Sequence, residues 1–235
     1  MERITLLAGP GELDAGESTV EGEAYRHLFR ARRLPVGASI RVVDGRGRAR
    51  WGKVARVDRN SARISLGDSA PTNEPALRLD LLVPTFRPER VSWLVEKATE
   101  LGVLGIHFLN MERAPRSFGG GTLDRLRRVA ISALEQCHRS CVPEITGPHL
   151  WSEIGGLTSG AESRWFLDPQ GGRASSGERG SAALLVGPEG GLAPQERQEL
   201  MNAGWTPIGL GPRILRIETA AVAGAAMVLL GLPEN

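Results

Sequence analysis

The sequence has little cysteine, little lysine and few aromatic residues, and it has no long apolar run. Its two cysteines, Cys137 and Cys141, exclude a disulfide framework and a zinc site built from cysteines alone. No stretch of about 18 apolar residues occurs, so we expect no transmembrane helix. Residues Met1–Thr5 lack the basic and apolar stretches that open a secretory signal, so we expect a cytoplasmic protein.

Arginine is abundant and unevenly distributed. Lys53 and Lys97 are the only lysines, so 27 of the 29 basic residues are arginines. Residues 26–63 hold eleven arginines and one lysine against two acidic residues, a net charge of +10, whereas the whole chain carries +2. Such a segment is either a solvated charged face or a surface that neutralises RNA phosphates. The scarcity of acidic residues within it favours RNA, because solvating surfaces usually mix both signs.

The first 70 residues predict a small β-rich domain. Short runs rich in valine, isoleucine and alternating arginine are separated by turn signals, which is typical of a small barrel. The expected strands are Ser39–Val43, Ala49–Asp58 and Ser61–Leu66, and Tyr25–Arg33 is an expected short helix. A polar, proline-containing stretch at residues 68–76 predicts a domain boundary, which divides the chain into residues 1–70 and 71–235.

Beyond residue 77 the pattern alternates between apolar strands and amphipathic helices. This order is typical of an α/β domain with a mostly parallel sheet and crossover helices. The expected strands are Leu77–Pro84, Gly105–Asn110, Arg164–Leu167, Ala182–Val186 and Pro207–Leu210. The expected helices are Glu89–Leu101, Leu123–His138, Pro194–Ala203 and Glu218–Leu230, and Gly171–Gly180 is an expected flexible loop.

The clearest local motif is Gly187-Pro188-Glu189-Gly190-Gly191, which follows a buried strand and precedes a helix. Ligands of open α/β sheets bind at the carboxyl ends of the strands, and glycine lets a ligand approach the backbone closely. The motif is neither a Walker sequence nor G-x-G-x-x-G. A tight turn without a ligand is the alternative interpretation.

A second glycine-containing loop, Leu210–Arg216, leads into an alanine-rich helix. Arg213 and Arg216 are either ligand contacts or surface residues, and Arg216 could instead pair with Glu218. Glu218 itself is either a functional carboxylate or a favourable charge at a helix N-terminus. The small residues between Ala220 and Ala226 allow close helix packing, within the fold or across a dimer.

A third cluster, Glu135–Arg139, places several polar groups at a helix end. Cys137 and Cys141 are four residues apart, but the only nearby imidazoles are His138 and His149, so we expect no metal site there. No oriented cysteine–histidine pair can be inferred either. We therefore interpret this cluster as hydrogen-bonding structure.

In their order along the chain, these motifs resemble the bacterial 16S rRNA uridine-N3 methyltransferase family (RsmE), within the SPOUT methyltransferases. The resemblance covers nearly the whole chain. It is carried by Glu96–Val103, Glu112-Arg113, Glu135–Arg139 with Val142-Pro143, Gly187–Leu192, Leu210–Arg216, Glu218-Thr219 and, near the N-terminus, His27, Arg30, Arg33, Gly37, Asp44 and Gly45. Two positions depart from the family pattern: Arg87 stands where a lysine is usual, and Ile217 stands where a threonine is usual.

The resemblance implies a PUA-like RNA-binding barrel over residues 1–70 and a SPOUT α/β domain with a C-terminal trefoil knot over residues 71–235. It implies methylation of N3 of a uridine in 16S rRNA of the small ribosomal subunit, with S-adenosylmethionine as the donor. A homodimer through the C-terminal domain is implied, without a metal or a membrane. The target nucleotide stays open, as does the choice between free rRNA and the assembled 30S subunit.

The resemblance also implies roles for particular residues. The cofactor is expected at Leu167, Gly187, Pro188, Glu189, Gly190, Gly191, Leu210, Gly211, Ile214, Leu215 and Arg216. RNA is expected at His27, Arg30, Arg32, Arg33 and Arg46, and catalysis at Arg216, Glu218, Arg139 and Arg113. Two other functions remain open: an RNA-binding assembly factor without catalysis, and a nucleotide-binding enzyme without an RNA substrate.

Overall fold

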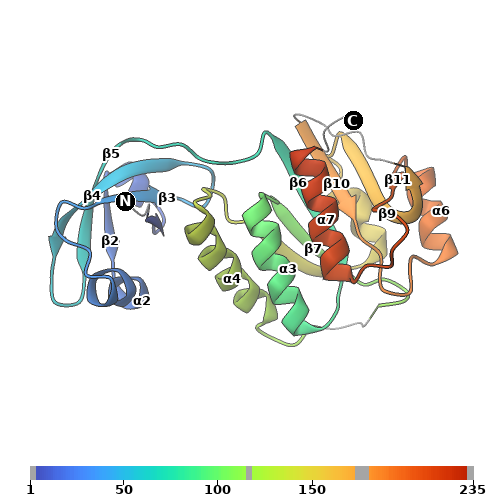
Figure 1. The fold of residues 1–235 in the computed structure, drawn as a ribbon, viewed down its shortest axis with the longest axis horizontal. Coiled ribbons are helices and arrows are strands. Elements are labelled where there is room, and N and C mark those ends of the chain that lie inside the picture. Colours follow the sequence, from blue (N-terminus) through green and yellow to red (C-terminus); the bar gives the residue numbers. More distant parts are fainter. Residues whose placement is uncertain (1–3, 115–117, 173–179, 232–235) are drawn as a thin grey trace. The chain divides into compact units, whose positions relative to one another are not determined.

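A computed structural model describes residues 4–114, 118–172 and 180–231. Contacts divide the chain into two compact units, each with a sheet of its own (Figure 1). The N-terminal unit comprises Met1–Glu74 and Leu134–Val142, and the C-terminal unit comprises Pro75–Ala133 and Pro143–Asn235. A segment distant in sequence, Leu134–Val142, thus belongs to the N-terminal unit.

The N-terminal unit is built on a five-stranded sheet in the order β1-β3-β4-β5-β2. Strands β1 and β3 pair in parallel, and the remaining pairs are antiparallel. The strands are β1 (Thr5–Leu7), β2 (Glu17–Val20), β3 (Ser39–Val43), β4 (Ala49–Val57) and β5 (Ala62–Ser69). The helical elements are α1 (Glu12–Ala15), α2 (Gly22–Tyr25) and a π-helical turn, η1 (Arg26–Ala31).

The helix expected over Tyr25–Arg33 is formed differently. It is the short α2 followed by the π-helical turn, in which the Arg32 N–H donates to the His27 carbonyl at 3.0 Å. The adjacent residues Leu28 and Phe29 are both buried in the core of this unit. The segment closes at Arg33, whose φ of 54° lies in the left-handed region.

The segment Leu134–Val142 closes a second part of the N-terminal core. Leu134 packs in one cluster with Val43, Ala49 and Ala70. Beside this cluster the buried Arg41 donates to the Ser140 hydroxyl and to the carbonyl of Pro71. The unit is therefore complete only when this distant segment is in place.

The C-terminal unit has a six-stranded sheet, parallel throughout, in the order β11-β9-β10-β6-β7-β8. The parallel sheet predicted from the alternation of strands and helices is confirmed. Its strands are β6 (Leu77–Pro84), β7 (Gly105–Leu109), β8 (Glu144–His149), β9 (Ser163–Gly172), β10 (Gly180–Leu185) and β11 (Thr206–Ile208). Its helices are α3 (Pro88–Leu101), α4 (Thr122–Cys137), which ends in the N-terminal unit, η2 (Trp151–Glu153, a 3-10 turn), α5 (Ile154–Leu157), α6 (Pro194–Asn202) and α7 (Ile217–Leu230).

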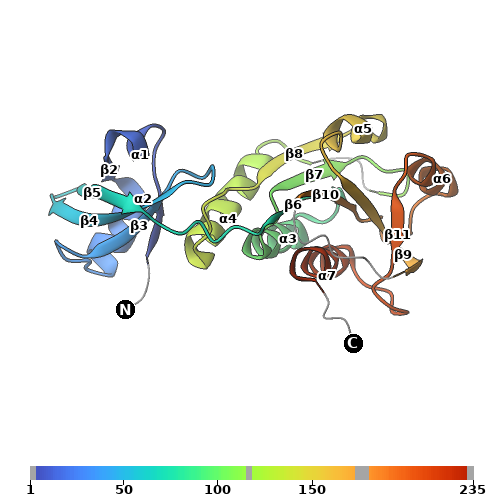
Figure 2. The same ribbon diagram turned by 90° about the horizontal axis from the view of Figure 1, so that it is seen from above.

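Helices cover both faces of this sheet. Figures 1 and 2 show α3 and α7 side by side on one face, with α5 on the other. On the second face, Ile154 of α5 and Leu200 of α6 share a core with Phe166 and Leu185. Helix α7 packs closely on the sheet, because a Cβ at Gly224 would lie 2.9 Å from the Leu184 Cδ2 atom. This packing holds the N-terminus of α7 near the loops that follow the strands.

The expected loop Gly171–Gly180 lies mostly outside the described residues. Gly171 and Gly172 end β9, Gly180 begins β10, and residues 173–179 are not described. Within the described ranges, no helix is long and apolar enough to cross a membrane.

Candidate active site

A cavity of about 540 Å³ lies in the C-terminal unit, between the end of β9 and the loops that follow β10 and β11. Every residue expected to bind the cofactor lines it, except Arg216. The structure adds lining residues that were not among those expected to bind the cofactor. These are Asp168, Pro169, Gln170, Val186, Leu192, Arg197, Arg213, Ile217 and Ala220.

The glycine-rich loop after β10 contains two glycines with different roles. Gly191 has a φ of 70°, and its N–H donates to the Pro188 carbonyl at 2.8 Å, so the tight turn itself requires glycine there. Gly190 lies outside the left-handed region, and a Cβ there would meet only the Arg113 side chain, at 3.6 Å or more. Neither the backbone nor packing demands glycine at position 190. Its missing side chain leaves room in the cavity instead.

The second loop places an apolar side chain at the cavity. Ile214 lines the cavity yet is 97% exposed, and Arg213 beside it is also exposed. Gly211 holds the loop in a left-handed turn with a φ of 91°. An isoleucine so fully open to solvent at a cavity is suited to cover an apolar part of a bound molecule.

Arg216 precedes α7 as its N-cap residue, and its side chain is exposed. Its side chain makes no cap hydrogen bond and has no hydrogen-bond or ion-pair partner among the described residues, whereas its backbone carbonyl accepts from the Ala220 N–H at 2.8 Å. The pairing of Arg216 with Glu218 that the sequence allowed is absent from the described ranges. The guanidinium of Arg216 is thus available beside the cavity.

Glu218 pairs with a different arginine, Arg90 on the first turn of α3. Arg90 Nε lies 3.5 Å from Glu218 Oε1, and Arg90 Nη1 lies 3.3 Å from Glu189 Oε1 on the glycine-rich loop. Glu218 is buried, and its second oxygen, Oε2, has no hydrogen-bond partner. A single guanidinium therefore contacts two carboxylates.

Two further contacts hold the glycine-rich loop against the segment that follows β7. Arg113 Nη1 donates to the Gly190 carbonyl at 3.0 Å. The buried carboxylate of Glu196 accepts hydrogen bonds from the backbone N–H groups of Glu112, at 3.0 Å, and Ala193, at 2.8 Å. Glu196 stands at the third position of α6, a pattern typical of a helix start, and that signal could have identified it in the sequence.

At the end of β9, Asp168 and Arg197 form an ion pair at 2.7 Å. Burial raises the pKa of Asp168, but hydrogen bonds from Arg197 and from the Gln170 N–H outweigh this and hold the pKa below its ordinary value. Both side chains line the cavity. The pair therefore presents a largely neutralised polar edge to a ligand.

The residues expected to bind RNA all lie in the N-terminal unit and are all exposed. His27 and Arg30 belong to the π-helical turn, and Arg32 and Arg33 follow it directly. Arg46 lies in the turn between β3 and β4. Arg30 also has a structural contact, because its Nη2 donates to the Arg59 carbonyl at 2.6 Å.

The cluster at the end of α4 also lies in the N-terminal unit. Arg139 is 2% exposed, and its guanidinium pairs with Glu74 at 2.7 Å. Glu135 accepts a hydrogen bond from the Leu7 N–H at 3.0 Å, and burial raises its pKa above the ordinary value. These bonds support the interpretation of the cluster as hydrogen-bonding structure. Among the described residues, no group of three His, Cys, Asp or Glu side chains could hold a metal ion.

The chain thus combines a parallel α/β unit that has a glycine-lined cavity with a small basic β-rich unit. Most of the chain also matches known sequence families. The profile of the RNA methyltransferase domain matches residues 72–229, and that of the RNA methyltransferase PUA domain matches residues 20–67. The chain belongs to this RNA methyltransferase family.

Individual relatives carry a more specific name. Proteins named ribosomal RNA small subunit methyltransferase E from Mycobacterium bovis and Aquifex aeolicus are each 28% identical to this chain. These alignments cover 90% and 89% of this chain, and 85% and 92% of the relatives. The solved structure of the Neisseria gonorrhoeae protein of the same name, bound to S-adenosyl methionine, superimposes with a TM-score of 0.81 at 27% identity and covers 98% of both chains.

Proposed function

We propose that this protein transfers a methyl group from S-adenosylmethionine to N3 of a uridine in 16S rRNA of the small ribosomal subunit, and that it does so in the cytoplasm. The observation that carries the proposal is the cavity formed by the two glycine-containing loops, with Gly190 left open. Family membership supports the reaction class. The relatives' names support the rRNA substrate, and the ligand of the Neisseria gonorrhoeae protein supports the methyl donor.

The cavity fits a donor of this size and chemistry. Its volume of about 540 Å³ lies within the range of small-molecule sites, roughly 300–1,000 Å³. Gly187–Gly191 and Leu210-Gly211 would hold the donor through backbone groups, while Leu167, Ile214 and Leu215 would contact its apolar surface. When bound, S-adenosylmethionine supplies an electrophilic methyl group on a sulfonium. The task of the chain is then to align that group with the acceptor nitrogen.

Methylation at uracil N3 requires removal of the N3 proton, and negative charge develops on the two flanking carbonyl oxygens. Arg216, whose side chain is exposed and has no partner in the described ranges, is our first candidate to stabilise that charge. Arg113 ranks second because it already donates to Gly190, and Arg139 ranks third because Glu74 holds its guanidinium. Glu189 or Glu218 would accept the proton.

The basic face of the N-terminal unit would bind the RNA. The proposed contacts are exposed histidine and arginine side chains. They are His27, Arg30, Arg32, Arg33 and Arg46. Phosphate contacts of this kind position the substrate without reading its sequence. We assign RNA binding to residues 1–70 and methyl transfer to residues 71–235.

Replacing Arg33 by alanine is expected to weaken RNA binding and to lower the slope of log affinity against log salt by about one, the value for one phosphate contact. Arg30→Ala should act in the same direction, with some loss of stability because Arg30 also bonds to the Arg59 carbonyl. Affinity for S-adenosylmethionine should not change. Titrations at several salt concentrations measure this, with the exposed Arg128→Ala in the C-terminal unit as the control. An unaltered salt slope in Arg33→Ala would contradict the assignment.

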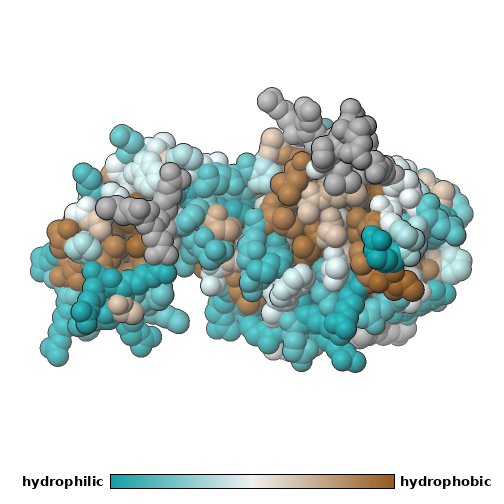
Figure 3. All heavy atoms as spheres, viewed as in Figure 1, coloured by the Kyte–Doolittle hydropathy of each residue, from teal (hydrophilic) through white to brown (hydrophobic). Residues whose placement is uncertain are grey.

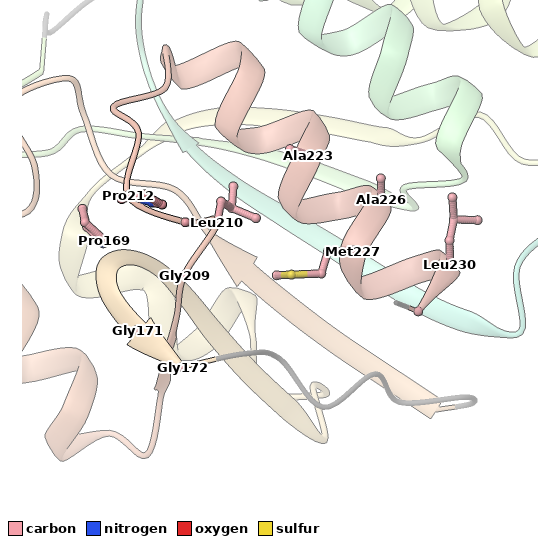
Figure 4. A pocket seen from close by; sticks show the side chains of 12 residues that line it. Pro169, Gly171, Gly172, Gly209, Leu210, Pro212, Ala223, Ala226, Met227 and Leu230 are labelled. Carbon is pink, nitrogen blue, oxygen red and sulfur yellow. The ribbon is translucent and has the colours of Figure 1, made fainter. Parts of the chain in front are cut away.

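We also propose that the C-terminal domain forms a homodimer and contains the trefoil knot of the SPOUT fold. An apolar groove of about 700 Å³ runs between α7 and the loop after β11, lined by Leu210, Ala223, Ala226, Met227 and Leu230 among others (Figure 4). Figure 3 shows hydrophobic residues gathered over α7. A second copy seated in this groove would lie next to the cavity, because the two share Pro169, Leu210 and Gly211.

Ala226→Arg tests the dimer, since it places a long charged side chain in this groove without filling the core. We expect the wild type to sediment as a dimer and Ala226→Arg as a monomer. Thr219→Arg, on the exposed side of the same helix, is the matched control and should remain dimeric. A dimeric Ala226→Arg variant would exclude this groove as the interface.

The proposed reaction is tested with purified protein, S-adenosylmethionine, and either 16S rRNA or 30S subunits from a strain that lacks the gene. Mass spectrometry of the digested RNA should show N3-methyluridine in one of the two substrates. Binding of both donor and RNA without any methylation would instead indicate an assembly factor. Donor binding with no RNA binding would indicate an enzyme that acts on another substrate.

A further inference from the structure

A buried carboxylate lies beside the cavity with only half of its hydrogen-bonding capacity used. Glu218 is 8% exposed, and no group of the described residues donates to its Oε2 atom. Its neighbours along α7, Ile217 and Ala220, both line the cavity. Glu218 itself is not among the residues that line the cavity, so its carboxylate lies behind the wall to which Ile217 and Ala220 contribute, largely shielded from water.

The cation that faces Glu218 is shared with a second carboxylate. Arg90 contacts Glu218 at 3.5 Å and Glu189 at 3.3 Å, and the Glu189 side chain is 66% exposed. Water therefore screens the charge of Glu189 much more than that of Glu218. At these distances one guanidinium compensates the buried charge incompletely, since close, well-directed hydrogen bonds are what normally make a buried ion pair favourable.

The other charged groups around the cavity are compensated or solvated. Asp168 pairs with Arg197 at 2.7 Å, and Arg213 is exposed. Glu196 is buried, but each of its oxygens accepts a backbone hydrogen bond. Arg113 is exposed and donates to the Gly190 carbonyl. Glu218 is thus the buried charge whose field on a ligand is least cancelled among the groups described around this cavity.

We propose that Glu218 makes the cavity discriminate between the positively charged methyl donor and its neutral product. This inference rests on the proposed function. S-Adenosylmethionine carries a sulfonium, whereas S-adenosylhomocysteine, which remains after transfer, carries an uncharged thioether. The field of a buried anion favours the sulfonium and loses that preference once the methyl has gone. Glu218 therefore acts as a specificity residue that retains the donor and releases the product.

The test is the ratio of two affinities, measured by calorimetric titration of the full-length protein with each compound. Glu218→Gln keeps the shape of the side chain and removes the charge, so we expect the preference for S-adenosylmethionine over S-adenosylhomocysteine to fall about tenfold, as for the loss of one charge interaction in a weakly screened site. Glu89→Gln is the control, because it makes the same change at an exposed carboxylate next to Arg90 on the first turn of α3, outside the cavity lining. There the ratio should change less than about twofold, because exposed charges are screened.

An unchanged ratio in Glu218→Gln would overturn the inference, and equal weakening of both compounds would show that Glu218 only packs the loop. Arg90→Gln provides a second, independent variant if Glu218→Gln does not fold. This variant removes the cation that faces Glu218, so it should raise the ratio, and a wild-type ratio in it would also overturn the inference. If neither compound binds the wild type, the proposed function itself fails.

Discussion

Gly190→Val is expected to weaken S-adenosylmethionine binding by about 100-fold or more while the protein stays folded. The backbone at Gly190 accepts a side chain, and a Cβ there would make only ordinary contacts, with Arg113 at 3.6 Å or more. The added valine therefore occupies the cavity rather than straining the fold. Forcing a ligand against extra methyl groups in a packed site costs about 1–3 kcal/mol, and the upper end of that range is a factor of about 100.

Two other glycines make this expectation specific. Gly160→Val introduces the same side chain at an exposed glycine with open space around it, and it should bind the donor as the wild type does. Gly191→Val places a β-branched residue at a φ of 70°, so it should lose stability as well as affinity. Calorimetric titration and thermal melting separate these outcomes. Normal affinity in a folded Gly190→Val protein would remove the glycine-rich loop from the binding site.

The second large effect is expected for Arg216→Ala, which should lower the single-turnover rate of methyl transfer by about 100-fold. The magnitude follows from the loss of one donor to a developing oxyanion. Donor affinity and melting temperature should change little, because this side chain makes no cap hydrogen bond and has no partner in the described ranges. Arg216→Lys should recover only part of the rate, since it keeps the charge but loses the planar fork.

A structural role for Arg216 gives a different pattern. If the side chain held the loop or a second subunit, then affinity, melting temperature and rate would fall together in the alanine variant. A near-normal rate would remove Arg216 from the mechanism. Arg113, which already touches the glycine-rich loop, and then Arg139 would be the next arginines to replace.

Local patterns predicted much of the fold. The run Leu77–Pro84 forms β6 with the bounds expected from the sequence, because its mostly apolar residues and the terminal proline act within the segment itself. Strand β8 was missed because Gly147-Pro148 interrupts its apolar pattern. The short β1 and β2 have too few residues to show a period.

The two loops of the site could be predicted for the same reason, since a strand, a glycine turn and a helix follow one another directly. The ion-pair partner of Glu218 could not be predicted from the sequence. Sequence proximity suggested Arg216, whereas the fold brings Arg90 from α3 to the first turn of α7. The contact between Glu196 and the segment after β7 could not be predicted either, because its Oε1 atom accepts a hydrogen bond from the N–H of Glu112, which is distant in sequence.

The origin of the N-terminal unit in two separate stretches has a consequence for how the protein is made. Leu134 packs in the core of this unit with Val43 and Ala49, and the Ser140 hydroxyl accepts a hydrogen bond from the buried Arg41. A chain emerging from the ribosome presents residues 1–74 long before this second stretch, so the unit cannot complete its core in the order of synthesis. Its folding must wait until Pro75–Ala133, a substantial part of the other unit, has been translated. Completion of the N-terminal unit thus depends on synthesis of part of the C-terminal unit.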